Sequence, residues 1–350
     1  MPRVLIPSDH RDWLVHWVNA YVRAGWEVAT GQYNFELRAA KYDLVHYLWA
    51  EELCRWQVPS PERLEHTINQ MRWWERHCPT IATVSNFYPH GFEGNAEFKK
   101  LFSAYYRHCS LVLHFSPILM RKVRDEFPGA QHDRHLLVNP LNYADLLKVQ
   151  KSRGPCRKDF GFSEQDFVVL VIGALRSWEE ICLISGAFSK CKVAEKRLLM
   201  AGRYEPSGST FQRRWKQIRW RFWLWRAAAI ASKGYIPDEE MYRYLDTADV
   251  VIVPRLLDLA SGIPALAMTF GTMVIAPSQG AYPDYLAGTE NLLYEPGSSS
   301  SLAAALEKAA RMDRGPIIQR NREVAGQWTG DKIVSDSMKA LDRILGTKFA

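Results

Sequence analysis

The sequence of 350 residues lacks long apolar runs, paired cysteine motifs and any DxD motif. No stretch approaches the ~18 uninterrupted apolar residues that a membrane-spanning helix needs, so we expect no transmembrane segment. Only a short apolar run precedes the charged residues near the N-terminus, and we expect no signal peptide there. The six cysteines lie far apart and form no CxxC pair, which indicates reduced thiols in the cytosol. Without a DxD motif or closely spaced His and Cys residues, we expect neither a metal nor another cofactor.

Acidic residues are absent from one whole stretch of the chain, between Pro206 and Pro237. Within it, residues 211–226 (FQRRWKQIRWRFWLWR) carry six basic side chains and four of the thirteen tryptophans. The whole chain has a formal charge of +7 and a pI of about 9.0. This charge favours an anionic partner, which could be nucleic acid, a lipid surface or a phosphorylated substrate. The length favours two domains, and a composition of 47% hydrophobic and 24% charged residues is that of a globular protein.

The pattern along the chain predicts an α/β fold in two halves. Short β-branched runs alternate with helix-like segments such as residues 13–24, which is typical of a parallel sheet with crossover helices. The strands expected in the first half are residues 3–7, 26–30, 42–49, 80–85 and 110–115. Those expected in the second half are residues 167–172, 197–201, 232–235, 250–253 and 273–276.

These halves predict two Rossmann-like, doubly wound domains with a cleft between them. A polar and basic segment, residues 139–157, is interpreted as the linker. We therefore expect an N-terminal domain over residues 1–150, a second domain over residues 151–328, and a C-terminal helix over residues 329–350 that packs back on the first domain. Ligands of such sheets bind at the carboxyl ends of the strands.

A diphosphate site is predicted where Ser261 and Gly262 follow a buried strand and precede an apolar helical run. A helix that starts there offers free backbone N–H groups and a positive dipole end, and glycine lets a phosphate approach closely. Arg176 and Arg203 follow two other strands of this half, and arginine donates to a diphosphate in a planar fork. The alternative is that these are ordinary loop arginines and an ordinary helix cap.

The order of motifs in the second half resembles the nucleotide-sugar-binding half of GT-B glycosyltransferases of the family 4-like group. The residues that carry this resemblance are FVVLVIGALRSW, LLMAGRY, GYIPDEEMYRYLDTADVVIVP, SGIPALAMTFGTMVIAPSQGAYPDYL and NLLYEPG. In the first half, DLVHYLWAEEL, TVSNFYPHG and LVNPLNY resemble exopolysaccharide glycosyltransferases similar to the xanthan β-1,4-mannosyltransferase. The resemblance implies a donor-binding set of Gly173, Arg176, Arg203, Arg255, Asp258, Ser261, Gly262, Ile263 and Tyr294.

The sequence departs from the family pattern at several of these positions. Asp258 and Leu266 stand where the family usually has two glutamates, and Glu179 replaces an expected lysine. Asp284 takes the place of a frequent glutamate. These changes leave open a second hypothesis, in which the chain is a catalytically inactive homologue that binds glycans or assists assembly.

The first half is expected to hold the acceptor and any general base. His90, in NFYPHG, matches the second histidine of the family, whereas Ser85 replaces the first. Asp9 and His10 follow the first strand, and a base would take the proton of the acceptor hydroxyl. The alternative for His90 is a loop histidine bonded to backbone. The remaining catalytic candidates are Glu51 and Glu52, for which we favour a solvated helix start instead. Trp49 and Asn86 are candidate acceptor contacts, although most buried indoles belong to the core, and we favour that explanation for Trp49.

The basic and aromatic stretch is predicted to form the helix that follows LLMAGRY. Phe211, Trp215, Ile218, Phe222 and Trp225 recur at helical spacing, so this stripe is expected to pack on the sheet. The opposite face would then present Arg213, Lys216, Trp220, Trp223 and Leu224. Indole and arginine together suit a membrane interface with anionic lipid. A purely structural surface and base stacking on single-stranded nucleic acid are the alternatives.

Together these observations lead to one principal hypothesis. The chain is expected to be a metal-independent hexosyltransferase on the cytoplasmic face of the inner membrane. It would move a sugar, such as mannose from GDP-mannose, to a polyprenyl-diphosphate-linked glycan in bacterial exopolysaccharide synthesis. A basic RNA-binding protein is a third class, but none of the usual RNA-binding motifs is present, and we expect no nucleic-acid partner.

Overall fold

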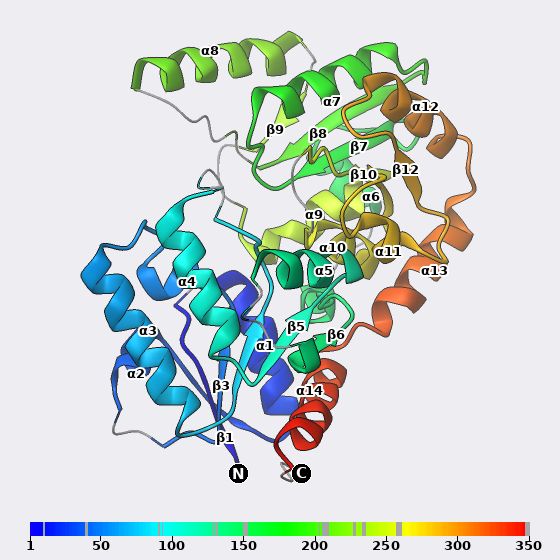
Figure 1. The fold of residues 1–350 in the computed structure, drawn as a ribbon. Coiled ribbons are helices and arrows are strands. Elements are labelled where there is room, and N and C mark those ends of the chain that lie inside the picture. The colour runs from blue at the N-terminus through cyan, green and yellow to red at the C-terminus, as the bar shows by residue number, and fades with distance from the viewer. Residues whose placement is uncertain are drawn as a thin grey trace. The chain divides into compact units, whose positions relative to one another are not determined.

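The computed structural model describes residues 1–9, 11–38, 41–89, 92, 94–127, 129, 132–149, 153–202, 204, 210–226, 229–232, 236–256 and 261–346. The chain forms two compact units (Figure 1), Met1–Leu141 with Trp328–Ala350 and Asn142–Gln327. Each unit holds a six-stranded sheet whose strand pairs are all parallel. The predicted class, two doubly wound α/β domains, is therefore confirmed. The units divide after Leu141 and Gln327, whereas the sequence placed the boundaries at residues 150 and 328.

The sheet of unit 1 has the order β2-β1-β3-β4-β5-β6. Its central strands β1, β3, β4 and β5 are largely buried, as expected for a parallel sheet covered on both faces, whereas the edge strands β2 and β6 are partly exposed. The chain runs from β1 outward to β2 and then returns to β3 on the other side of β1, so the topological switch point lies between β1 and β3. The bounds are β1 Arg3–Ile6, β2 Glu27–Thr30, β3 Leu44–Tyr47, β4 Thr80–Thr83, β5 Leu111–His114 and β6 His135–Leu137.

The helices of unit 1 include one from the far end of the sequence. Helix α14 (Gly330–Leu345) packs against α1 (Arg11–Arg23), and a Cβ on Gly330 would lie only 2.4 Å from the Cβ of Ala20. Ile333, Val334 and Leu341 of α14 share a buried cluster with Val4 and Leu44 of the sheet. The other helical segments are α2 Gln32–Glu36, η1 Glu51–Cys54, α3 Pro61–Glu75, α4 Ala96–Arg107, α5 Pro117–Glu126 and η2 His132–Arg134.

The sheet of unit 2 has the order β12-β11-β10-β7-β8-β9. Its first strand, β7, lies between β8 and β10, so this unit has its own switch point between β7 and β10. Strand β9 covers Ile230–Ala231, two residues earlier than predicted, and residues 233–235 of the prediction lie outside the described residues. The sequence analysis did not predict β6 or β12. The bounds are β7 Phe167–Ile172, β8 Lys196–Ala201, β10 Val250–Ile252, β11 Met273–Pro277 and β12 Leu292–Tyr294.

The segment interpreted as a linker contains two helical pieces, η3 (Ala144–Val149) and α6 (Arg153–Asp159). Within α6, the buried Arg157 donates to the carbonyl of Asp166 at 3.0 Å and to the carboxylate of Asp249 at 2.7 Å. Its buried charge is thus paired and hydrogen-bonded. The other helices of unit 2 are α7 Trp178–Lys190, α8 Thr210–Arg226, α9 Asp238–Thr247, α10 Ile263–Phe270, α11 Tyr282–Leu286, α12 Ser299–Ala309 and α13 Arg314–Gly326.

The predicted orientation of α8 is wrong. Trp215, Ile218 and Phe222, expected to pack on the sheet, are 54%, 58% and 58% exposed. Trp220 is buried, and Trp223 and Leu224 pack against the core of the unit. The helix has apolar residues on two faces, and the indole pair Trp220 and Trp223, stacked at 5.0 Å, is the one that fills the space beside the core. Arg213 is exposed and Lys216 is half-buried. The side chains of Phe211 and Trp225 lie outside the described set.

None of the helices in the described ranges is long and apolar enough to cross a membrane.

Candidate functional site

The first candidate site lies at the switch point of unit 2, where β7 and β10 end. Gly173 directly follows β7 and has a φ of +87°, a conformation that favours glycine. Its backbone N–H donates to the carbonyl of Ala201 at 2.8 Å. A Cβ on Gly202 would lie 2.1 Å from the carbonyl oxygen of Gly173, so the two strand ends meet with no room for a side chain. Because neither residue has a side chain, a ligand could approach the backbone closely at this point.

A buried ion pair lies next to Gly173, since Arg255 Nη2 is 3.8 Å from the position of a Cβ on that glycine. Arg255 follows β10, and its Nη1 lies 3.1 Å from Oε1 of Glu180 on α7. Both side chains are buried, with 5% of each exposed. Glu180 also accepts the backbone N–H of Arg176 at 2.8 Å, which fixes the loop between β7 and α7. The predicted donor residue Arg255 is thus neutralised within the protein, and half-buried Arg176 is held beside it.

The start of α10 borders this cluster. Ser261 Oγ accepts the backbone N–H of Ile263 at 3.3 Å, so Ser261 acts as a local cap. Ile263 is close to the turn after β7, since its Cδ1 lies 3.6 Å from the position of a Cβ on Gly173. Pro264 has no N–H and removes one donor from the first turn. A Cβ on Gly262 would lie 2.6 Å from the hydroxyl of Tyr143, which brings that phenol to the helix start.

Tyr294 supports the site from β12. Its hydroxyl donates to the carbonyl of Val253 at 2.9 Å, and burial raises the pKa of the phenol well above its usual range. Gln279, after β11, donates to the carbonyls of Arg255 and Leu256 at 3.3 and 2.9 Å. These bonds hold the loop after β10 in place. Arg203 and Asp258, also predicted to bind the donor, lie outside the described residues.

The second candidate site lies at the switch point of unit 1, where β1 and β3 end. The backbone N–H of Asp9 donates to Oε1 of Glu52 at 2.8 Å. Gln32 donates its side-chain amide to the carbonyl of Glu52 and its backbone N–H to Oδ2 of Asp9, the latter at 3.4 Å. The carboxylate of Asp9 is on an exposed residue, whereas Glu52 is only 2% exposed.

Glu51 is the second buried carboxyl of this site. The side-chain amide of Asn86, which follows β4, donates to Oε1 of Glu51 at 2.6 Å. Burial, with a smaller contribution from the charge of Glu52, raises the pKa of Glu51 to about 7. The interpretation of Glu51 and Glu52 as a solvated helix start is therefore wrong, because the 3₁₀ turn of η1 carries both side chains into the protein. Through these bonds Glu52 joins the loop after β1, and Glu51 the loop after β4, to the turn after β3.

The remaining predicted residues of unit 1 have separate positions. Trp49 is half-buried in an indole cluster, with ring centroids 5.3 Å from Trp13 and 5.9 Å from Trp56, which fits a packing role. Ser85 donates its hydroxyl to the carbonyl of Leu48 at 2.9 Å, which ties the segment after β4 to the end of β3. His10 and His90 lie outside the described residues.

The strand-end geometry reveals two residues that sequence reasoning missed, Glu180 and Tyr143. A signal for Glu180 exists, because Ser177 caps α7 by accepting the N–H of Glu180, in the S-x-x-E pattern of a capping box. The signal for Tyr143 is only its place in LVNPLNY. Within the described ranges, no group of three or more His, Cys, Asp and Glu residues could hold a metal ion.

A family model matches part of the chain. Residues 166–311 match the family model of "Glycosyl transferases group 1", which covers most of unit 2. No curated protein sequence matches the chain.

Solved structures match over nearly the whole chain. Sucrose-phosphate synthase from Thermosynechococcus elongatus superposes with a TM-score of 0.72 at 17% identity, covering 99% of both chains. Anabaena HepE in complex with UDP-glucose gives a TM-score of 0.71 at 14% identity, covering 98% of this chain and 100% of that one. The catalytic domain of starch synthase IV from Arabidopsis thaliana, bound to ADP and acarbose, gives 0.63 at 12% identity, covering 99% and 100%. At such identities the likeness establishes a shared fold, the two-domain GT-B architecture.

Proposed function

We propose that this chain, with a GT-B fold and a second unit that matches group 1 glycosyl transferases, is a glycosyltransferase that uses a nucleotide diphosphate-sugar. The observation that carries the proposal is the convergence of Gly173, Arg176, Ser261 and Gly262 at the switch point of unit 2. In open α/β sheets this is the position where ligands bind. HepE, which has the same fold, is crystallised with UDP-glucose, and this supports the ligand class.

In this proposal the diphosphate lies over the start of α10. The backbone of Gly262 allows close approach, and the guanidinium of Arg176 supplies charge from the loop that Glu180 fixes. Because Arg255 is already paired with Glu180, it acts by holding this loop and not by binding the diphosphate directly. Tyr294 acts in the same way, because its hydroxyl is bonded to the carbonyl of Val253.

The acceptor is assigned to unit 1. His90 takes the proton of the acceptor hydroxyl as a general base, on the strength of its place in NFYPHG. Asn86, four residues earlier, is fixed by Glu51, and Asp9 is fixed by Glu52, so both loops that border the acceptor have defined geometry. Asp9 is the exposed carboxylate of the group and is the second candidate for the base.

The finer assignment rests on the sequence motifs. We infer a mannosyl donor, GDP-mannose, and a polyprenyl-diphosphate-linked glycan as acceptor in exopolysaccharide synthesis. The enzyme would act without a metal or other cofactor, as a peripheral protein on the cytoplasmic face of the inner membrane. The basic stretch between Pro206 and Pro237 supports attraction to anionic lipid.

Three features favour a second candidate function, a catalytically inactive glycan-binding or assembly partner. Arg255 is paired in a buried ion pair, Glu179 stands at the place of a family lysine, and Leu266 stands at the place of a family glutamate. The first two reduce the positive charge available to a diphosphate, and the third removes a carboxylate that could contact the sugar or ribose.

A thermal-shift panel of nucleotide diphosphates and their sugars tests the proposal. A ligand that binds only the folded protein raises the Tm, by an amount that corresponds to about 2.7 kcal/mol at 100 times its Kd. The expected result is a GDP- or UDP-dependent shift, followed by turnover of the stabilising donor. A shift without turnover would favour an inactive homologue that keeps the donor site. No shift with any nucleotide would reject the glycosyltransferase and leave the glycan-binding or assembly partner.

A further inference from the structure

Helix α8 lies on the outside of unit 2, beside α7 (Figure 1). Its exposed side chains include an apolar stripe. The stripe consists of Trp215, Ile218 and Phe222, which are each more than half exposed. They recur at steps of three and four residues, so they lie in one row along the helix. An exposed row of this size on a soluble unit indicates an interaction surface.

Arginines flank the row on both sides. Arg214 and Arg221, seven residues apart, follow one edge, and Arg219 follows the other, four residues after Trp215. All three arginines are exposed, and the sequence has no acidic residue between Pro206 and Pro237. The surface therefore combines aromatic and aliphatic side chains with positive charge, and α8 itself contributes no acidic residue.

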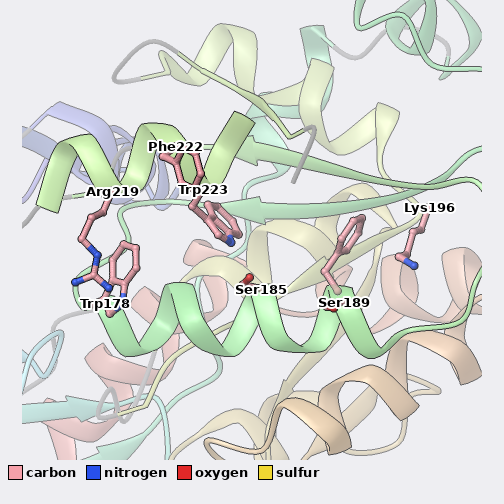
Figure 2. Close-up of a pocket in the computed structure, with 8 residues that line it drawn as sticks. Trp178, Ser185, Ser189, Lys196, Arg219, Phe222 and Trp223 are labelled. Carbon is pink, nitrogen blue, oxygen red and sulfur yellow. The ribbon is translucent and has the colours of Figure 1, made fainter. Parts of the chain in front are cut away.

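A contact with α7 holds the side chain of Arg219. The guanidinium of Arg219 lies 4.1 Å from the ring centroid of Trp178 on α7, a cation–π contact that Figure 2 shows reaching from one helix to the other. Next to it, a groove of about 540 Å³ opens between the two helices. Its lining is aromatic and basic with two hydroxyl groups: Trp178, Ser185, Phe188, Ser189, Lys196, Arg219, Phe222 and Trp223.

We propose that the outer face of α8, formed by Trp215, Ile218 and Phe222 with Arg214, Arg219 and Arg221, binds the surface of an anionic lipid bilayer. Indole and phenyl rings locate at the headgroup level, and a helix that lies in this plane buries its apolar row while its arginines meet lipid phosphates. The groove beside Arg219 gives a headgroup a place between aromatic walls. This surface deepens the peripheral location in the proposed function, but it does not depend on which sugar is transferred.

Other occupants fit these residues less well. If two copies met through this face, six arginines would come together with no acidic residue of α8 to neutralise them. Single-stranded nucleic acid would need bases stacked on successive rings, and the aliphatic Ile218 stands in the middle of the row.

Co-sedimentation with lipid vesicles tests the proposal on the full chain, with no donor or acceptor present. We expect wild-type protein to bind vesicles that contain phosphatidylglycerol, to bind pure phosphatidylcholine vesicles less, and to be released as salt rises. Since each basic residue near an anionic surface contributes about 1 kcal/mol, the variant Arg214→Gln/Arg221→Gln should bind about 30-fold more weakly. The variant Trp215→Ala/Phe222→Ala should also lose binding to these vesicles, while its Tm stays at the wild-type value because both side chains are exposed.

Two control variants make the result specific. Tyr33→Ala removes a 74% exposed aromatic of unit 1 and should leave vesicle binding unchanged. Trp220→Ala removes a buried indole of the same helix and should lower the Tm. Wild-type protein that ignores anionic vesicles at low salt would overturn the proposal. So would a Trp215→Ala/Phe222→Ala variant that binds as wild type, or a face that binds a single-stranded oligonucleotide or a second copy and not vesicles. A nucleotide-dependent thermal shift would survive any of these outcomes, which separates this proposal from that of glycosyl transfer.

Discussion

The side-chain amide of Asn86 donates to Oε1 of Glu51 at 2.6 Å, and this bond joins the loop after β4 to the turn after β3 inside unit 1. Glu51 is 1% exposed, and its carboxyl has a pKa of about 7. A carboxyl of this kind is neutral in mildly acidic solution and charged in mildly basic solution. Its protonation therefore couples the geometry of these two loops of unit 1 to pH.

Stability should fall as pH rises through this titration. The folded pKa, about 7, is above the ordinary 4.5, so the folded state holds a proton that the unfolded state has released between these values. The favourable contribution is complete below about pH 4.5 and is lost as pH passes 7, at a cost of about 3 kcal/mol. Glu51→Gln removes the charge, so its Tm should exceed that of wild type at pH 8 and match it near pH 4.5. Parallel Tm profiles at all pH values would contradict the assignment.

The proton acceptor is tested by His90→Ala. We expect turnover to fall by about 10²–10⁴-fold, because the acceptor hydroxyl loses its base, while donor affinity stays the same. Asp9→Asn is the matched comparison on the exposed carboxylate. A near wild-type rate for His90→Ala with a large loss for Asp9→Asn would transfer the role to Asp9.

The diphosphate contact is tested by Arg176→Ala. Loss of a charged hydrogen bond should weaken nucleotide binding by roughly 1.5–3 kcal/mol, measured by titration calorimetry. Arg197→Ala, which removes an arginine paired with Asp166 at 2.8 Å, should leave nucleotide affinity unchanged. Unaltered affinity in a folded Arg176→Ala protein would reject this part of the site.

The pair Glu180 and Arg255 should respond asymmetrically to substitution. Glu180→Ala leaves a buried guanidinium without its carboxylate and should lower the free energy of unfolding by about 3–5 kcal/mol. The double variant Glu180→Leu/Arg255→Met removes both charges and should recover much of this loss in denaturant melts. It should not recover nucleotide binding, because the loop of Arg176 is no longer held. Equal stability of the single and double variants would show that the pair is not coupled.

The contact between strand ends predicts a difference between two glycines. Gly202→Ala should destabilise unit 2 and weaken nucleotide binding, because its Cβ would overlap the carbonyl oxygen of Gly173. Gly326→Ala, at the exposed end of α13, meets no atom within 4 Å and should keep or raise stability by about 0.4–1 kcal/mol. Thermal melts of both variants with and without nucleotide provide the measurement. If Gly202→Ala kept the wild-type Tm and nucleotide binding, the backbone at Gly173 and Gly202 would have to be able to move apart, and the prediction would fail.

The strands could be predicted from the sequence where short apolar runs of β-branched residues marked them. The buried runs at β1, β7 and β10 were predicted within about two residues, because β-branched residues in short apolar runs specify strands directly. The short strand β6 has a half-polar sequence, HLL, and was missed. The burial of Glu51 and Glu52 was missed because it depends on Asp9 and Asn86, which come from distant strands.

The orientation of α8 shows the same limit more clearly. Its sequence has two apolar faces, and periodicity favoured the longer one, which the structure exposes. What decides between them is the neighbouring surface, where Trp220 packs 5.8 Å from the ring of Tyr204 and Arg219 stacks on Trp178. Neither partner is adjacent in sequence, so only the folded structure reveals which indoles are core and which are surface.

The packing of α14 on α1 has a consequence for the order of folding during synthesis. Ile333, Val334 and Leu341 complete a core whose other members include Val4 and Leu44, so the ribosome must finish all of unit 2 before unit 1 can close. Unit 2 is continuous and can fold as soon as residue 327 has emerged, while the core of unit 1 still lacks the apolar side chains of α14. The half of the molecule that is made first is therefore the half that is finished last.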